Sequence, residues 1–352
     1  MLDDIKLISE IDKSEMLKAV ENFSKQIKES KDIVDSAEIS RVYKVDNIII
    51  SGMGASAISG DIIQSLYRER SDIPIFVTRQ YDLPKWANKN TLVLSQSYSG
   101  NTEETLSTFK HAYQKHCKII GTSSGGKLQE YCEKRQVPHI EIPSGFQPRA
   151  ATGYMLFSLI YALNKTGVIT HDMESEIKET IELVEDFSKH NNRNVFEKEN
   201  LSKQITKKIV NKIPRIYGWD FYIPIAKRWC TQFNENSKII SSFYEASEAS
   251  HNDIVGWSMN PEASKNYSCI IFRDREDESR HISAHLNFMK ELFEGVAGAF
   301  IEIPVFGKKR LAKMMYLMQL GDFVSCYLAI LRKTDPTPVS VIIELKEKLA
   351  KL

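Results

Sequence analysis

The sequence predicts an α/β protein with two halves, each built on a parallel sheet flanked by helices. Short runs of branched apolar residues, as in buried strands, alternate along the chain with longer stretches of helical periodicity. Strands that alternate with helices in this way form parallel βαβ units. A polar, asparagine-rich stretch at 190–194 separates two such series, and 352 residues are enough for two domains. We place the predicted domains at residues 1–160 and 161–352.

The first half begins with roughly 45 residues of helical spacing and high charge. Helical stretches then alternate with short apolar runs, as a doubly wound sheet requires. The runs that predict buried strands are residues 47–50, 73–77, 91–94, 117–121 and 137–142. Two long helices are expected between residues 149 and 189.

The alternation resumes after residue 194. Strands are expected at 213–219, 267–272 and 299–304, and helices at 221–233, 281–293 and 311–332. A proline-rich break at Asp335-Pro336-Thr337-Pro338 precedes a last helix that runs to about residue 349.

The composition narrows the classes of function. Lys and Arg number 47 and Asp and Glu 46, so the net charge of +1 offers no field that attracts nucleic acid or an acidic membrane. The N-terminal stretch lacks the apolar core of a signal peptide, and no apolar run approaches the roughly 20 residues of a membrane helix. The five cysteines are scattered and never spaced C-x-x-C, which argues against disulfides and structural zinc. We therefore expect a cytoplasmic protein with no nucleic-acid or membrane partner.

The strongest functional signal follows the third predicted strand, where small hydroxyl side chains crowd a turn before a helix. They are Ser95, Ser97, Ser99 and Thr102. Ligands bind at such strand ends in open α/β sheets, and the helix N-terminus favours an anion. Gly100 would let the backbone turn close to that anion. The turn therefore predicts a phosphate site, whereas the alternative, an ordinary helix cap formed by Thr102, needs only one hydroxyl.

A second turn rich in serine and glycine, Ser51–Ala57, follows the first predicted strand. It matches the dinucleotide-binding pattern G-x-G-x-x-A, but the next strand ends in Thr78-Arg79 rather than in the acidic residue that such a site uses. A tight structural turn and an NADP site are both alternatives here. A second ligand-facing turn, with Ser56 as a hydroxyl donor, fits better.

Other segments carry groups suited to anion binding and acid–base chemistry. Arg149 is expected in the first turn of a helix, where the dipole disfavours a cation, so it either holds an anion or bonds a loop carbonyl. Glu235 and His251 could supply a base and an acid, although each taken alone suits a solvated loop. His281 and His285 have metal-ligand spacing, but no third ligand is evident, and we expect no metal.

Taken together, these segments resemble the family of bifunctional phosphoglucose/phosphomannose isomerases, and their order and spacing cover nearly the whole sequence. The serine-rich turn is shared by all sugar isomerase (SIS) domains and implies only sugar-phosphate binding. The Pro-Arg, Asn-Glu-Asn and His-Asn segments are more specific to the isomerase family. The segments that carry the resemblance are Gly52–Ser56, Ser97–Glu104, Gln147–Ala150, Phe233–Lys238, His251–Trp257 and Asp335–Pro338.

The resemblance implies two SIS domains, each a flavodoxin-like parallel sheet flanked by helices, in a homodimer with active sites at the subunit interface. It implies an isomerase without a cofactor that interconverts glucose 6-phosphate, and mannose 6-phosphate, with fructose 6-phosphate through ring opening and a cis-enediol(ate). Its phosphate-binding hydroxyls fall on Ser56, Ser97, Ser99 and Thr102, and the backbone beside the substrate falls on Gly54, Ala55 and Gly100.

The resemblance also implies the residues that act on the sugar. Its enediolate-positioning arginine falls on Arg149 and its proton-transfer base on Glu235. The ring-opening histidine falls on His251, which the neighbouring subunit would lend, and a lysine near the sugar ring is matched by Lys346, one of several lysines in that stretch.

The sequence departs from the family pattern at three places. Ala55 stands where a glycine is usual, Asp253 where a glutamate is usual, and Glu248-Ala249-Ser250 where a Pro-Glu-Leu-Asn-like run is usual. The alternatives to this function are another SIS isomerase acting on an amino-sugar or heptose phosphate, and a non-catalytic SIS regulator that senses a sugar phosphate. A regulator would not need Arg149, Glu235 and His251 together, so their joint presence favours catalysis.

Overall fold

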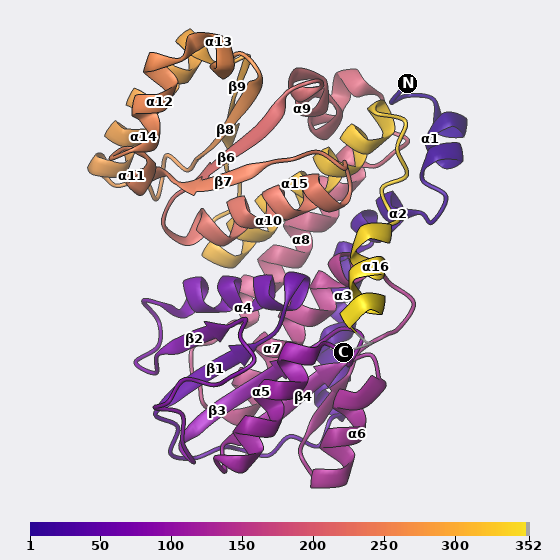
Figure 1. Ribbon diagram of the computed structural model, residues 1–352, viewed down its shortest axis with the longest axis vertical. Helices are drawn as coiled ribbons and strands as arrows, with labels where there is room; N and C mark the ends of the chain where they lie inside the picture. The colour runs from indigo at the N-terminus through magenta and orange to yellow at the C-terminus, as the bar shows by residue number, and fades with distance from the viewer. Residues whose placement is uncertain (350–352) are drawn as a thin grey trace. The chain divides into compact units, whose positions relative to one another are not determined.

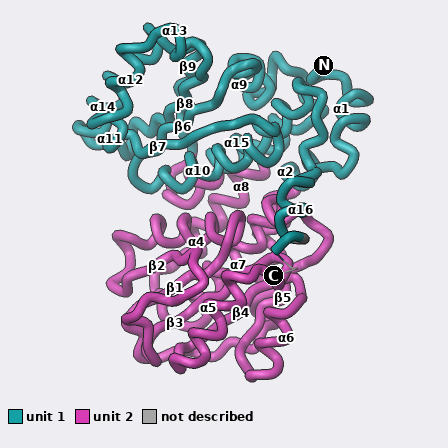
Figure 2. The backbone as a smooth tube through the Cα atoms, viewed as in Figure 1, with its two compact units in different colours: residues 1–21, 186–306, 316–352 teal, residues 22–185, 307–315 magenta. Residues whose placement is uncertain are grey.

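The structure, a computed structural model, describes residues 1–349 and shows two parallel β-sheets flanked by helices (Figure 1). The chain folds into two compact units (Figure 2). Unit 2 comprises residues 22–185 and 307–315, and unit 1 comprises residues 1–21, 186–306 and those from 316 onward. The α/β fold class with two parallel sheets, expected from the sequence, is confirmed.

The two units do not follow the simple order of the sequence. The boundary expected between residues 160 and 161 lies inside α7 (Thr152–Thr166), whereas the compact units change at residue 185. The first 21 residues join unit 1, and residues 307–315 return to unit 2. Sequence patterns show where helices and strands begin, but they do not show which distant segments pack together. The domain boundary at residue 160 therefore rests on the sequence alone and stays a prediction.

The sheet of unit 2 has the strand order β2-β1-β3-β4-β5 and every neighbouring pair is parallel. This is the flavodoxin-like order, in which ligands bind outside the carboxyl ends of the strands. All five strands match expected runs to within a few residues. They are β1 (Asn47–Ser51), β2 (Ile75–Thr78), β3 (Thr91–Gln96), β4 (Lys118–Ser123) and β5 (His139–Glu141).

Helices cover this sheet in two layers. On one side α4 contacts β1, β2 and α7, and α3 packs along α7; on the other, α5 and α6 contact β3, β4 and β5. Alternate strand residues face opposite layers, so Ile49 and Val93 join the apolar cluster formed with Phe109 of α5 and Leu128 of α6. The helices are α3 (Phe23–Ser36), α4 (Gly54–Tyr67), α5 (Glu103–Gln114) and α6 (Gly126–Arg135).

The sheet of unit 1 has the order β7-β6-β8-β9, again with all pairs parallel. The expected strands form β6 (Ile213–Gly218), β8 (Tyr267–Arg273) and β9 (Ala299–Pro304). The sequence missed β7 (Ser242–Glu245), which is short and lies at the sheet edge, where its half-exposed side chains form no apolar run. The longer helices are α8 (Glu174–Asn191), α9 (Leu201–Ile209), α10 (Ile223–Glu235), α14 (Arg280–Val296), α15 (Arg310–Leu331) and α16 (Ser340–Leu349).

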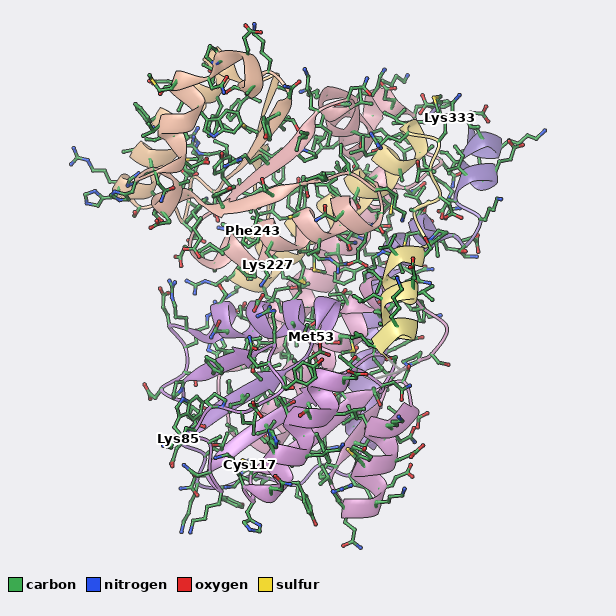
Figure 3. All side chains as sticks on the ribbon, viewed as in Figure 1. Met53, Lys85, Cys117, Lys227, Phe243 and Lys333 are labelled. Carbon is green, nitrogen blue, oxygen red and sulfur yellow. The ribbon has the colours of Figure 1, made fainter. Side chains whose placement is uncertain are left out.

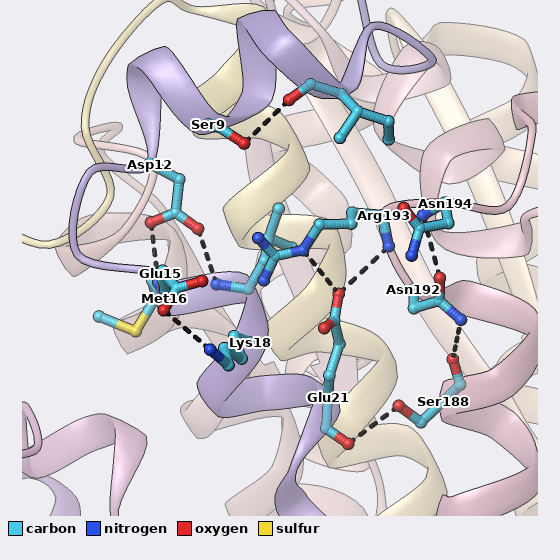
Figure 4. Close-up of polar contacts among 12 residues, drawn as sticks. Ser9, Asp12, Glu15, Met16, Lys18, Glu21, Ser188, Asn192, Arg193 and Asn194 are labelled. Atoms are coloured by element: carbon cyan, nitrogen blue, oxygen red, sulfur yellow. Dashed lines mark hydrogen bonds and ion pairs between the residues drawn. The ribbon is translucent and has the colours of Figure 1, made fainter.

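The N-terminal segment of unit 1 is held by polar contacts (Figure 4). Asp12 accepts hydrogen bonds from the backbone amides of Met16 at 2.8 Å and Leu17 at 2.9 Å and so caps α2 (Met16–Glu21), which follows α1 (Ile5–Ile11). Glu21 accepts from Nε of Arg193 at 3.1 Å, and its carbonyl accepts from Oγ of Ser188 at 3.0 Å. These contacts join residues far apart in sequence within one unit.

Contrary to the expectation that no apolar run approaches the length of a membrane helix, α15 is long and apolar enough to cross a membrane by length and composition alone. Its most apolar window is 94% buried inside the protein. A core helix must present apolar residues on all sides because it has neighbours on all sides, and α15 fits that description.

Candidate active site

The hydroxyl-rich turn lies directly after β3, the central strand of the sheet in unit 2. Figure 3 shows the two ends of this sheet: Met53 follows β1 at the carboxyl end, whereas Lys85 and Cys117 lie at the opposite end, before β3 and β4. The turn is therefore at the edge where open parallel sheets bind their ligands.

Two hydroxyls of the turn are paired with each other rather than with the following helix. Oγ of Ser97 lies 2.8 Å from Oγ1 of Thr102, and Ser97 itself is 1% exposed. Thr102 is the N-cap residue of α5, yet its side chain forms no capping hydrogen bond. Ser99 is exposed at the tip of the turn, where its Oγ accepts from the amide of Asn101 at 3.3 Å. The structure thus disfavours the simple interpretation of Thr102 as an ordinary cap.

The turn keeps its shape because Gly100 packs on a neighbouring loop. Gly100 has φ +67°, and a Cβ there would lie 1.8 Å from the carbonyl oxygen of Gly125. The carbonyl of Gly100 accepts from the amide of Leu128 at 2.9 Å, and the carbonyl of Tyr98 accepts from Ser124. Only glycine can occupy this position, so the backbone of the turn is fixed from outside.

The second turn rich in serine and glycine meets the same edge of the sheet. A Cβ on Gly52 would lie 2.9 Å from Cβ of Ser56 and 3.1 Å from the carbonyl of Gln96, so the Ser51–Ala57 turn approaches the end of β3 closely. Ser56 is 4% exposed, while Gly54 begins α4 with φ +52° and open space around it. Ala55, the next residue of α4, is half-buried. The structure therefore brings Ser56 to the edge that carries Ser97.

The NADP alternative is not supported by the contacts of this turn. Arg79, the one residue suited to a 2′-phosphate, donates to the carboxylate of Asp61 on α4 at 2.5 Å. An arginine already bound by a carboxylate is not available to a phosphate without losing that ion pair.

Arg149 lies in the short 3₁₀ turn Pro148–Ala150 immediately before α7, close to its expected place in a first helical turn. It is 3% exposed, and its carbonyl accepts from Oγ1 of Thr152 at 2.9 Å. The loop before it is tied to the hydroxyl-rich turn by Tyr98, whose hydroxyl accepts from the amide of Phe146 at 2.8 Å and donates to the carbonyl of Pro143 at 3.2 Å. Burial raises the pKa of Tyr98, which keeps this hydroxyl a donor. Sequence reasoning missed Tyr98, although it stands inside the quoted turn.

Glu235, in unit 1, is the last residue of α10, and the residues around it are anchored. Asn236 and Ser237 are fully buried and bond to α15, while Nζ of Lys238 donates to the carbonyl of Glu235 and, at 3.0 Å, to that of Pro336. The Asp335–Pro338 segment singled out in the sequence is thus in contact with the segment that carries Glu235.

His251 is exposed in the turn between α11 (Ala246–Ala249) and α12 (Asp253–Met259). Asp253 holds this turn on the sheet, because its carboxylate accepts from the guanidinium of Arg215, from the hydroxyl of Tyr217 at 2.7 Å and from Nε1 of Trp257 at 2.9 Å. Asp253 is therefore a structural anchor for the His251 turn.

The remaining candidates are less constrained. Lys346 lies exposed on α16, in the last turns that the structure describes. His281 and His285 lie on α14, and within residues 1–349 no three His, Cys, Asp or Glu side chains are grouped as metal ligands. Each unit by itself thus presents part of the expected set: Ser56, Ser97, Ser99, Thr102 and Arg149 in unit 2, and Glu235, His251 and Lys346 in unit 1.

Comparisons with known proteins identify the family of the chain. Residues 198–349 match a family model described as the bacterial phospho-glucose isomerase C-terminal SIS domain. The bifunctional phosphoglucose/phosphomannose isomerase of Caldicellulosiruptor bescii is 39% identical over 339 residues, which cover 96% of this chain and 99% of that protein. The protein of the same name from Aquifex aeolicus is 36% identical over 338 residues, with coverage of 96% and 99%.

The fold is also similar to that of solved structures. A glucose-6-phosphate isomerase like protein from Thermus thermophilus superposes with a TM-score of 0.65 at 16% identity, covering 97% of this chain and 99% of that one. At this identity the likeness supports the fold alone, and the expected SIS architecture is confirmed.

Proposed function

Because the chain belongs to the family of bifunctional phosphoglucose/phosphomannose isomerases, we propose that it interconverts glucose 6-phosphate and mannose 6-phosphate with fructose 6-phosphate. The observation that carries the proposal is the pair of hydroxyls on buried Ser97 and half-buried Thr102 at the carboxyl end of β3, where the Thr102 side chain does not cap α5. Hydroxyl donors beside a helix N-terminus are well suited to the oxygens of a phosphate.

The proposed role of this turn is to anchor the substrate. Ser56, Ser97, Ser99 and Thr102 bind the phosphate, and Gly54, Ala55 and Gly100 provide backbone that lies close to it. Binding energy from the phosphate, which does not react, holds C1 and C2 of the sugar in register with the acid–base groups. A fixed glycine turn supports this role because a preformed site loses little entropy when the ligand binds.

The chemistry moves a proton between C1 and C2 of the open-chain sugar. His251 donates a proton to the ring oxygen and opens the ring, and Glu235 then removes the C2 proton and returns it to C1. The proton at C2 is a very weak acid, so Arg149 and Lys346 stabilise the oxyanion that develops as it leaves. In the cis-enediol the C2 stereocentre is lost, which allows glucose and mannose phosphates to share one site when the C2–C3 bond rotates.

We further propose a cytoplasmic homodimer in which His251 enters the active site of the partner subunit. Two observations support this proposal. His251 is exposed in its turn, and in the neighbouring α12 the side chains of Val255 and Met259 are 60% and 79% exposed. Apolar side chains exposed beside a candidate catalytic residue are typical of a surface that another chain covers. All five cysteines are free, as a reducing compartment allows.

The decisive experiment replaces Glu235 with glutamine, which keeps the shape of the side chain but removes the base. Exchange of the C2 proton of glucose 6-phosphate with solvent should fall by about 10²–10⁴-fold, the usual contribution of a positioned general base. The affinity for glucitol 6-phosphate, which cannot isomerise, should stay within about threefold because its phosphate contacts remain. Glu245→Gln, at an exposed carboxylate of the same unit, is the matched control.

The outcomes separate the candidate functions. Undiminished exchange in Glu235→Gln would contradict the assignment of the base. Wild-type protein that binds glucitol 6-phosphate but isomerises neither hexose phosphate would instead support the regulator alternative.

A further inference from the structure

The C-terminal end of α10 is joined to α15 by a set of buried polar contacts, all within unit 1. The set begins two helical turns before Glu235, where Nε and Nη2 of Arg228 donate to the two carboxylate oxygens of Asp322 at 3.1 Å and 3.0 Å. It ends directly after Glu235, at Asn236 and Ser237. A helix that is tied at two separate points cannot slide or rotate along its neighbour.

The second tie is centred on Ser325. Its hydroxyl accepts from Nδ2 of Asn236 at 3.0 Å and donates to the carbonyl of Asp322 at 2.8 Å, while its own carbonyl accepts from Oγ of Ser237 at 2.6 Å. Asn236, Ser237 and Ser325 are all 0% exposed. Buried hydrogen bonds are costly to leave unmade, so these contacts persist whenever the unit is folded.

Close packing next to the first tie fixes the distance between the two helices. Nε1 of Trp229 donates to the carbonyl of Leu317 at 2.8 Å, and a Cβ on Gly321 would lie 2.3 Å from that same nitrogen. The indole therefore lies directly on the backbone of α15. Sliding, rotation and separation of α10 are all restricted by named contacts.

We propose that Asn236 and Ser325 are positioning residues for Glu235, which hold the backbone from which its carboxylate reaches C1 and C2 of the sugar. The inference rests on the proposed function of Glu235 as the proton-transfer base. A base that serves two carbon atoms in turn must be held within a fraction of an ångström, and a misplacement of about 1 Å can cost roughly 100-fold in rate. Asn236 is adjacent to Glu235, so its amide transmits the position of α15 over one peptide bond.

The test removes the Ser325 hydroxyl and compares the result with an equivalent deletion elsewhere. Ser325→Ala should lower kcat by about 10- to 100-fold, with KM and the Kd for glucitol 6-phosphate within about threefold of wild type, because the proposed phosphate contacts lie in unit 2. Ser268→Ala is the matched control, since Ser268 is equally buried in unit 1 and its hydroxyl has no hydrogen-bond partner among residues 1–349. Ser325→Thr, which keeps the hydroxyl, should recover most of the lost kcat.

A double-mutant cycle identifies the contact itself. If Asn236 and Ser325 act through each other, Asn236→Ala combined with Ser325→Ala should lower kcat by no more than the larger single effect. A double variant whose kcat falls by the product of the two single effects would overturn the proposal. If Ser325→Ala does not fold, Ser237→Ala removes the neighbouring bond from the base segment and should give a smaller fall in kcat, again at constant KM.

The remaining outcomes are also decisive. Ser325→Ala with the kcat of the Ser268→Ala control would overturn the positioning role, and so would a joint loss of kcat, substrate affinity and melting temperature, which would mean general destabilisation. Wild-type protein without isomerase activity would overturn the proposed function and this inference together, whereas an active wild type with an indifferent Ser325→Ala overturns only the inference.

Discussion

Replacing Gly100 with alanine tests how the phosphate turn is built. At φ +67° an L-residue costs roughly 1–2 kcal/mol relative to glycine. The new Cβ would also lie 1.8 Å from the carbonyl oxygen of Gly125, where ordinary contact begins near 3.4 Å. Because the obstacle is backbone, the two loops must separate, and Ser97 and Thr102 will move with the turn.

We expect Gly100→Ala to lose more ligand affinity than a variant that carries only the backbone strain of a positive φ. Losing one hydrogen bond to a charged phosphate costs about 1.5–3 kcal/mol, which weakens binding by roughly 10- to 100-fold. Isothermal titration with glucitol 6-phosphate measures this loss directly, and thermal unfolding measures the accompanying loss of stability.

Gly145→Ala is the matched control for this experiment. Gly145 also has a positive φ, +91°, but a Cβ there would meet nothing within 4 Å. It should therefore show the strain, with a lower melting temperature, but bind glucitol 6-phosphate within about threefold of wild type. If Gly100→Ala binds as tightly as Gly145→Ala, the turn is not held by its contact with Gly125 and the account of the site is wrong.

Three further predictions follow from other contacts. If His251 is lent to the partner subunit, mixing the inactive variants Glu235→Gln and His251→Ala should restore about a quarter of wild-type activity. Half of a randomly mixed population is mixed dimers, and each of these has one intact site of two. No recovery would mean that both residues come from one chain. Burial lowers the pKa of His139 from its ordinary 6.5, so the folded protein disfavours the protonated imidazole. The stability should therefore fall as the pH drops through the pKa of the unfolded chain. In His139→Gln the melting temperature should depend less on pH between about pH 7 and pH 5. Gly321→Ala should lower the free energy of unfolding by roughly 1–3 kcal/mol through overpacking against Trp229, a loss that urea titration would detect; an unchanged midpoint would contradict the close contact between α10 and α15.

Much of the fold is predictable from the sequence because its central strands are buried on both faces. Such strands read as apolar runs, and all five strands of unit 2 were expected close to their true positions. The edge strand β7 and the short helices after it were not predicted, because half-exposed segments of about four residues carry too little periodicity. The packing of segments that are distant in the chain, such as residues 307–315 against the rest of unit 2, produces no recognisable pattern in the local sequence.

The candidate site was less accessible to sequence reasoning. Hydroxyl crowding pointed to the phosphate turn, and the pairing of Ser97 with Thr102 agrees with it. The supports of the site were not foreseeable, because Tyr98, Asp253 and Ser325 act through partners 36 to 89 residues away. Residue type and spacing suggest which groups react, whereas the residues that hold them are defined only by packing.

The four strands of the unit 1 sheet follow the same order as the first four strands of the unit 2 sheet, but the side chains at the carboxyl ends of the strands differ. β8 lies beside β6 as β3 lies beside β1, so the residues after β8 correspond to the hydroxyl-rich turn. Nε and Nη2 of Arg273, the last residue of β8, donate to both carboxylate oxygens of Glu278 at 2.8 Å and 2.9 Å, with both side chains almost fully buried. A protein carboxylate thus already takes the contacts that an arginine would offer to a phosphate. Losing one partner of that buried pair should cost roughly 3–5 kcal/mol, so we expect the arginine at this edge to stabilise unit 1, whereas we propose that the equivalent edge of unit 2 binds the substrate phosphate.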